Sequence, residues 1–229
     1  MSIVVLIILA LAAAVFLPGW WVKRVMRRYA QPIDRYPGSG AELARHLLDR
    51  LGLEAVKVEQ TDPGTDHYDP AARVVRLSPD NYQHASLTAI TVAAHEVGHA
   101  VQHADGYQPL ILRTKLVQSA QKFQRLGAIL IILMPVVLLA LRLPAAGVTM
   151  LLVGLAALGS GIVVHLMTLP TELDASFKRA LPLLRGGGYL KPQDHRPARR
   201  ILTAAALTYV AASMMGLLNF WWWLRMLRP

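Results

Sequence analysis

The sequence predicts a mainly α, multi-pass membrane protein with about four transmembrane helices and a small cytoplasmic α+β part. Three observations lead to this prediction. Hydrophobic residues make up 54% of the 229 residues and charged residues only 17%, which is unlike an ordinary soluble domain. Four apolar runs approach or exceed the ~20 residues that cross a bilayer. Lysine and arginine gather in alternate connecting segments, as they do when one side of a membrane is cytoplasmic.

The first element is an apolar run over residues 3–17, which is followed by Trp20, Trp21 and four basic residues. A secretory signal peptide has its positive charge before the apolar core and small residues at a cleavage site after it, the reverse of this order. We therefore expect residues 1–22 to form an uncleaved first transmembrane helix with its N-terminus outside.

Residues 23–125 form the predicted cytoplasmic part, a small α+β unit. Ser39 begins a helical pattern that Gly52 would end. Two stretches predict strands, because their residues alternate or are rich in β-branched types; they are residues 55–59 and 73–77. Turn-forming residues separate or follow the strands; they are residues 61–66 and 78–79, and residues 67–70 lead into another turn.

The stretch Thr91–His103, TVAAHEVGHAVQH, carries the chemistry. His95 and His99 are four residues apart, so in a helix their imidazoles lie on one face and can share one zinc ion. Glu96 is turned aside, where it can take a proton from a zinc-bound water. This is the HExxH arrangement. Small apolar neighbours favour it over a buried helix whose histidines only form hydrogen bonds.

A catalytic zinc normally has three protein ligands, so one is missing from this helix. His103 lies about 12 Å along the helix from His95, too far to share the metal. Asp105 lies ten residues after His95, but Gln102 stands where that ligand pattern needs a glycine. Glu172 opens a polar stretch straight after a long apolar run, which suits a ligand delivered by a second helix. Glu172 is favoured, and Asp105 stays open.

Residues 126–170 predict a transmembrane hairpin, made of the apolar runs 126–141 and 147–169 with a short link between them. Residues 171–200 are expected to lie in the cytoplasm and to bring the third zinc ligand. Residues 201–229 predict the fourth transmembrane helix and an outer C-terminus. Buried helices of a soluble bundle are the alternative, but polar residues interrupt these runs too rarely to favour it.

Basic residues set the predicted orientation. They follow the first run, precede the second and lie between the third and fourth, so these segments should be cytoplasmic. The net charge of +10 follows from this asymmetry and from attraction to anionic lipid, so no nucleic-acid partner is expected. His95 and Glu172 then reach the same face of the membrane. Cysteine is absent, which excludes disulfides and thiolate metal ligands.

Three motifs in their order along the chain, HYDPAARVVRLSPDNY, HEVGHAVQH and LPTELDASFKRA, set among apolar spans, resemble the YugP-type family of bacterial membrane zinc metallopeptidases. The resemblance covers nearly the whole chain. It implies a zincin-like metallopeptidase part of the gluzincin type, in which Zn²⁺ is the cofactor and Glu96 is the general base. The ligands that it implies are His95, His99 and Glu172.

The chain departs from the wider gluzincin pattern after the third ligand. The acid that often stands four residues after the ligand glutamate is here Ser176, while Asp174 lies two residues after it. Which of the two steadies His95 or His99 through a hydrogen bond stays open.

The predicted function is a membrane-bound zinc-dependent endopeptidase in the bacterial inner membrane, with its active site facing the cytoplasm. Peptides or membrane proteins are the expected substrates, and the lipid bilayer is the expected environment. A membrane-protein partner and a homo-oligomer stay open. One rival is a zinc-binding membrane scaffold or regulator with little or no turnover. Another is intramembrane proteolysis, but polar residues flank the zinc helix too closely for a crossing.

Three smaller features also stay open. The strand before the zinc helix can pair its edge with an extended peptide or be only a structural hairpin. His67 and Tyr68 are candidates for stabilising an oxyanion, without support from their spacing. Residues 186–197 form a flexible stretch that is either a lid or only a loop.

Overall fold

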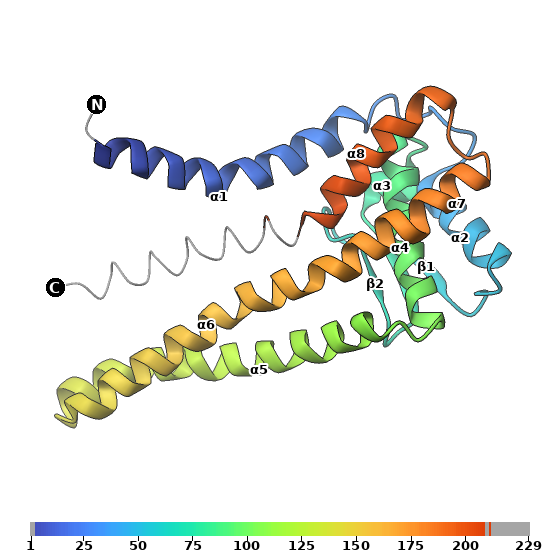
Figure 1. Ribbon diagram of the computed structural model, residues 1–229. Coiled ribbons are helices and arrows are strands. Elements are labelled where there is room, and N and C mark those ends of the chain that lie inside the picture. Colours follow the sequence, from blue (N-terminus) through green and yellow to red (C-terminus); the bar gives the residue numbers. More distant parts are fainter. Residues whose placement is uncertain (1–2, 209–210, 212–229) are drawn as a thin grey trace. The chain divides into compact units, whose positions relative to one another are not determined.

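The computed structural model describes residues 3–208 and residue 211. These residues are mainly helical and contain one three-stranded sheet (Figure 1). The chain divides into two compact units. Among the described residues, one comprises residues 3–19, 112–168 and 211, and the other comprises residues 20–111 and 169–208.

The first unit contains a helical hairpin and most of α1 (Ile3–Arg28). The hairpin is formed by α5 (Gln108–Pro135), the short π-helix η1 (Val136–Ala140) and α6 (Pro144–Leu173), which run side by side (Figure 1). The backbones of α5 and α6 approach closely at a pair of glycines, because a Cβ on Gly127 would lie 3.1 Å from the carbonyl oxygen of Gly154. Small residues permit such close helix packing.

Two segments of this hairpin, Gln108–Ala140 and Pro144–Gly161, are long and apolar enough to cross a membrane. Few of their residues are buried: 11% and 18% of the most apolar stretch of each. Core helices of a soluble bundle bury their apolar faces far more completely. The described residues thus agree with the predicted hairpin and do not confirm the four-span prediction. The predicted fourth helix, residues 201–229, lies largely outside the described residues.

The second unit is built around α4 (Leu87–Ala104), most of which is buried. Its N-cap Ser86 accepts a hydrogen bond from the backbone N–H of Ala89 at 3.1 Å. The helix α2 (Gly40–Arg50) packs against α4 and begins at Ser39 as predicted. Ser39 and Glu42 form a reciprocal capping box, which fixes the start of α2.

The sheet has the strand order β1-β3-β2. The strands β1 (Lys57–Gln60) and β3 (Val74–Leu77) are parallel and confirm the two predicted strands, although β1 begins later than expected. The edge strand β2 (His67–Asp69) is antiparallel to β3. The prediction that residues 67–70 lead into a turn is confirmed by the turn after Asp69, but the strand before it was not predicted. The Asp69 carboxylate accepts the backbone N–H groups that follow it, so the turn starts after Asp69 and leaves β2 extended.

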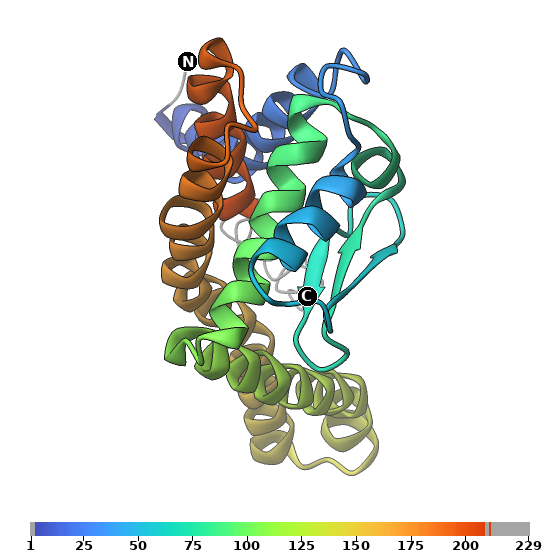
Figure 2. The same ribbon diagram turned by 90° about the vertical axis from the view of Figure 1, so that its right-hand side faces the viewer.

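The remaining elements of the second unit pack mainly around α4. They are α3 (Pro79–Gln83), the π-helix η2 (Asp174–Ala180), α7 (Leu181–Gly186), the 3₁₀-helix η3 (Pro192–Asp194) and α8 (His195–Ala206). α4 lies between the sheet and α2 on one side and α7 and α8 on the other (Figure 2). The HExxH helix is therefore the centre of this unit.

Candidate metal centre

Three side chains meet inside the second unit: His95 and His99 of α4, and Glu172 near the end of α6. All three are buried, with exposed fractions between 1% and 5%. Their ligand atoms lie within 4.8 Å of one another. The Nε2 atoms of His95 and His99 are each 3.3 Å from Oε2 of Glu172. The structure thus brings together the three ligands expected from the sequence.

Gly98, between the two histidines, lets the chain beyond Glu172 lie against α4. A Cβ at this position would lie 2.8 Å from the backbone carbonyl oxygen of Ala175, which is closer than such contacts occur. Because a backbone carbonyl cannot swing aside as a side chain can, only glycine permits this approach. The approach brings η2, and Glu172 just before it, next to the zinc-binding face.

A hydrogen-bond chain fixes the proton position on His99. Nε2 of Gln102 donates to the carbonyl oxygen of Thr171 at 2.9 Å and to Oδ1 of Asp174 at 3.0 Å. The amide oxygen of Gln102 is therefore directed at Nδ1 of His99, 2.9 Å away. An amide oxygen only accepts, so Nδ1 of His99 carries the proton in this network.

A second chain does the same for His95. The hydroxyl of Ser176 lies 3.2 Å from the carbonyl oxygen of Leu202, to which it can only donate. The Ser176 oxygen then accepts from Nδ1 of His95, 3.0 Å away. In the neutral form of each histidine, which is the form that binds a metal ion, the lone pair is therefore on Nε2, the atom that faces Glu172.

This donor set fits a zinc ion. Two imidazole lone pairs directed at one carboxylate oxygen repel it, unless a cation lies among them. Two His and one Glu are the ligands of a well-known class of catalytic zinc sites. Hydrogen bonds from the outer nitrogen of each histidine are the usual means of orienting such ligands. The cluster is thus arranged to hold a metal ion.

Glu96 follows His95 on α4 and is also buried. One residue along a helix turns the side chain by about 100°. Glu96 accordingly does not belong to the cluster of ligand atoms found among the described residues. This placement is suited to a group that acts on a neighbouring molecule without binding the metal.

The two discarded or minor ligand candidates have other partners. Asp105 is exposed and pairs with the guanidinium of Arg179, which also donates to Asp174 at 3.0 Å. Burial lowers the pKa of Arg179, but the hydrogen bonds with Asp105 and Asp174 outweigh it, so this pKa is raised. His103 is paired through Nδ1 with the hydroxyl of Tyr68 at 2.7 Å. Neither Asp105 nor His103 belongs to the ligand cluster of the described residues.

The oxyanion candidates and the flexible stretch also have definite contacts. Tyr68 bonds to His103, and burial raises the pKa of its hydroxyl. His67 bonds through Nδ1 to the carbonyl oxygen of Thr65 at 2.6 Å. Within residues 186–197, Asp194 is buried and accepts hydrogen bonds from Arg35 and Tyr36, so this end of the stretch is anchored.

Sequence reasoning missed the role of Gln102. It lies three residues after His99 on the same helix, a spacing at which two side chains meet. This spacing could have predicted the contact between Gln102 and His99.

Comparison with known proteins gives two matches. The family described as "Putative neutral zinc metallopeptidase" matches residues 3–228. The protein named "Putative membrane protease YugP" of Bacillus subtilis (strain 168) is 38% identical over 197 residues, which cover 86% of this chain and 84% of the relative. No solved structure is significantly similar to the chain.

Proposed function

Because the chain belongs to this neutral zinc metallopeptidase family, we propose that it is a membrane-bound zinc-dependent endopeptidase acting at the cytoplasmic face of the bacterial inner membrane. The observation that carries the proposal is the buried cluster of two Nε2 atoms and one carboxylate. Both histidines are oriented by a hydrogen bond at Nδ1. This is the usual arrangement of a histidine whose Nε2 binds a metal ion.

The proposed metal ligands are Nε2 of His95, Nε2 of His99 and the carboxylate of Glu172. When bound, zinc supplies a lowered pKa for a water molecule and polarises the scissile carbonyl. Glu96 is the proposed general base. Its carboxylate accepts the proton of the attacking water and later passes it to the leaving amine.

The surrounding residues hold this arrangement. Ser176 keeps the His95 ring in place from η2, and Gln102 does so for His99 from within α4. Asp174 acts one step further out, because it accepts from Gln102 and from Arg179. Arg179 remains a cation here, since its pKa is raised. This network is proposed to keep both Nε2 atoms unprotonated and directed at the metal.

The proposed topology has four spans with both termini outside. Residues 1–22, 126–170 and 201–229 hold the spans, and residues 23–125 and 171–200 are cytoplasmic. The apolar character of α5 and α6 supports the central hairpin, and the distribution of lysine and arginine supports the orientation. A site at the bilayer surface favours membrane proteins, or their cytoplasmic tails and loops, as substrates.

The edge strand β2 is a proposed binding site for an extended peptide. Among the described residues, β2 is paired on one side only, with β3, so the other side has backbone groups available for a substrate. β2 also touches α4, through Tyr68 and His103. Backbone pairing of this kind would bind peptides with little selectivity for side chains.

The test uses the full chain in detergent, with zinc content and cleavage of casein and of a membrane protein as readouts. Glu96→Gln should keep zinc and lose cleavage, while Glu172→Ala should lose both. Glu54→Gln, at an exposed glutamate, is the matched control and should behave as wild type. Zinc-loaded wild-type protein that cleaves neither substrate would favour a zinc-binding scaffold or regulator without turnover. Zinc-free wild-type protein would contradict the proposed metal site, and cleavage that survives Glu96→Gln would contradict Glu96 as the general base.

A further inference from the structure

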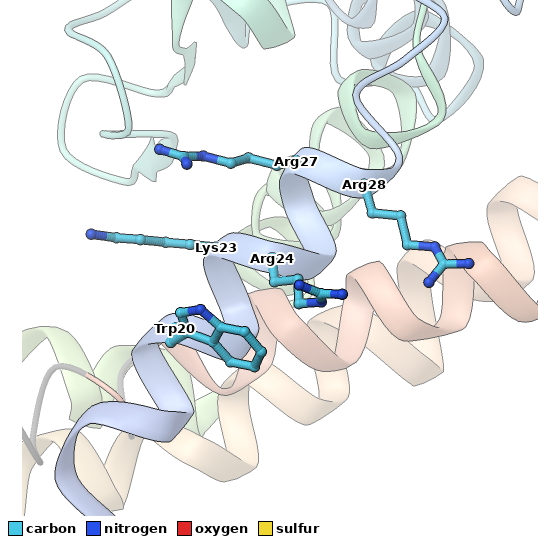
Figure 3. A pocket seen from close by; sticks show the side chains of 5 residues that line it. All are labelled: Trp20, Lys23, Arg24, Arg27 and Arg28. Carbon is cyan, nitrogen blue, oxygen red and sulfur yellow. The ribbon is translucent and has the colours of Figure 1, made fainter. Parts of the chain in front are cut away.

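The last two turns of α1 carry an exposed basic face. Four cations and one tryptophan line a hollow of about 560 Å³; they are Trp20, Lys23, Arg24, Arg27 and Arg28. Figure 3 shows Lys23 and Arg27 reaching out on one side of the helix and Arg24 and Arg28 on the other. The hollow between these side chains is open to a ligand.

The spacing of these residues explains the shape of the face. At about 100° per residue, the four cations cover about 140° of the helix circumference, with Trp20 near the middle of that arc. The other side of the same turns is buried, because Val22 and Val25 belong to the hydrophobic core of the second unit. One face of the C-terminal end of α1 is thus packed in the core, and the opposite, basic face is exposed.

Among the described residues, the four cations have no anionic partner. Within residues 3–208 none of them pairs with a carboxylate, and the rest of the sequence holds no Asp or Glu. Arg24 instead lies over the ring of Trp20, 5.2 Å from its centroid. Cations three and four residues apart on a helix repel one another, so an external anion would stabilise this face.

The position of the face along the chain indicates which anion. The same helix is apolar over residues 3–17, and Trp20, with 56% of its surface exposed, stands between the apolar run and the cations. Tryptophan favours the interface of a membrane, and arginine binds phosphate oxygens through paired N–H groups. We propose that this basic face binds the phosphate of an anionic phospholipid headgroup, with Trp20 packed beside the glycerol region.

Such a lipid would be held next to the start of the zinc helix. The hydroxyl of Thr88, in the first turn of α4, donates to the carbonyl oxygen of Met26 at 2.9 Å. The backbone N–H of Thr88 donates to the carbonyl oxygen of Tyr29 at 3.1 Å. The bound lipid would therefore contact the C-terminal end of α1, which is hydrogen-bonded to the first turn of α4. This proposal does not depend on peptidase activity.

The test is lipid retention by the full chain in detergent, measured by native mass spectrometry with phosphatidylglycerol and with phosphatidylcholine. Wild type should retain phosphatidylglycerol preferentially. The double variant R24Q/R28Q should bind phosphatidylglycerol about 30-fold more weakly, because each of the two lost cations contributes a similar share of the binding free energy at an anionic lipid surface. The matched control is R196Q/R200Q, two exposed arginines with the same spacing on α8, which should bind as wild type.

Three results would overturn the proposal. The first is equal retention of phosphatidylglycerol and phosphatidylcholine by the wild type. The second is an equal loss of phosphatidylglycerol binding in R24Q/R28Q and R196Q/R200Q. The third is that inorganic phosphate displaces the bound lipid as effectively as added phosphatidylglycerol does. The last would indicate a site for free phosphate. Unchanged zinc content in R24Q/R28Q shows that the variant is folded, so a failure here is distinct from a failure of the peptidase proposal.

Discussion

Gln102 donates a hydrogen bond to Asp174 at 3.0 Å and so joins the zinc helix α4 to the π-helix η2. The same amide group also reaches the carbonyl oxygen of Thr171, next to the third ligand. Because its oxygen faces His99, this glutamine links the proposed ligand His99 to the segment that carries the proposed ligand Glu172. The geometry of the metal cluster should therefore depend on residue 102.

Replacing Gln102 with Ala should weaken zinc binding by about 10–100-fold, the usual effect of losing a group that orients a metal ligand. His99 loses the acceptor for its Nδ1 proton, and Asp174 loses a donor. Competition with a chelator measures the zinc affinity. Gln83→Ala, at an exposed glutamine of α3, is the control. Wild-type affinity in Gln102→Ala would show that the hydrogen bond does not orient His99.

Replacing Gly98 with Ala should destabilise the protein by about 1–3 kcal/mol, as expected for overpacking. The new Cβ would lie 2.8 Å from the carbonyl oxygen of Ala175, so η2 must move away from α4. Thermal unfolding measures the loss, and zinc affinity should fall with it because Glu172 moves too. Gly186→Ala meets nothing within 4 Å and should leave both quantities unchanged. Equal behaviour of the two variants would contradict the close approach.

Asp194 should stabilise the protein at neutral pH and lose this effect in acid. Burial raises the pKa of Asp194, but the hydrogen bonds from Arg35 and Tyr36 outweigh it, so the folded-state pKa lies below the ordinary 3.8. The contribution is complete above 3.8 and is lost as the pH falls through the lowered folded-state pKa. Asp194→Asn should cost about 1–3 kcal/mol at pH 7.

Thermal unfolding of wild type and Asp194→Asn from about pH 2 to pH 7 tests this expectation. The range must extend below about pH 4, where the carboxylate becomes protonated. The difference between the two proteins should shrink on the acid side. Asp49→Asn removes an exposed ion pair with Arg45 and should cost less than about 0.5 kcal/mol at any pH. A gap between wild type and Asp194→Asn that stays constant with pH would be inconsistent with the ionised pair.

Zinc should raise the thermal stability of the wild type in a concentration-dependent manner. At a free zinc concentration of 100 times the dissociation constant, binding to the folded state alone stabilises it by about 2.7 kcal/mol. Glu172→Ala should show little of this shift, because the metal loses the ligand that does not come from α4. Unfolding curves recorded with added zinc and with chelator measure it. The same shift in Glu172→Ala would mean that zinc binds elsewhere.

The sequence predicts best where spacing alone determines geometry. The four-residue spacing of His95 and His99 places both imidazoles on one helical face, and the structure shows them there. Ser39 also predicts the start of α2 correctly, because the N-cap of a helix depends only on local residues. β2 was missed for a similar local reason: His67–Asp69 has the composition of a turn, but pairing with β3 keeps it extended.

Contacts between distant segments could not be derived in this way. The sequence left Ser176 and Asp174 as alternatives for one role, whereas the structure gives each a different one. Ser176 contacts His95 directly, and Asp174 reaches His99 only through Gln102. This distinction depends on how η2 packs against α4. A π-helix has no simple residue pattern, so neither its presence nor its register was predictable.

The distance along the chain between His99 and Glu172, 73 residues, sets an order of events during synthesis. At roughly 5–20 residues per second, a ribosome needs about 4–15 s to reach the codon for Glu172 after that for His99. Throughout this interval the nascent chain carries His95 and His99 without the proposed third ligand, Glu172. With this proposed ligand set, stable metal loading is expected only after both arms of the hairpin have been made.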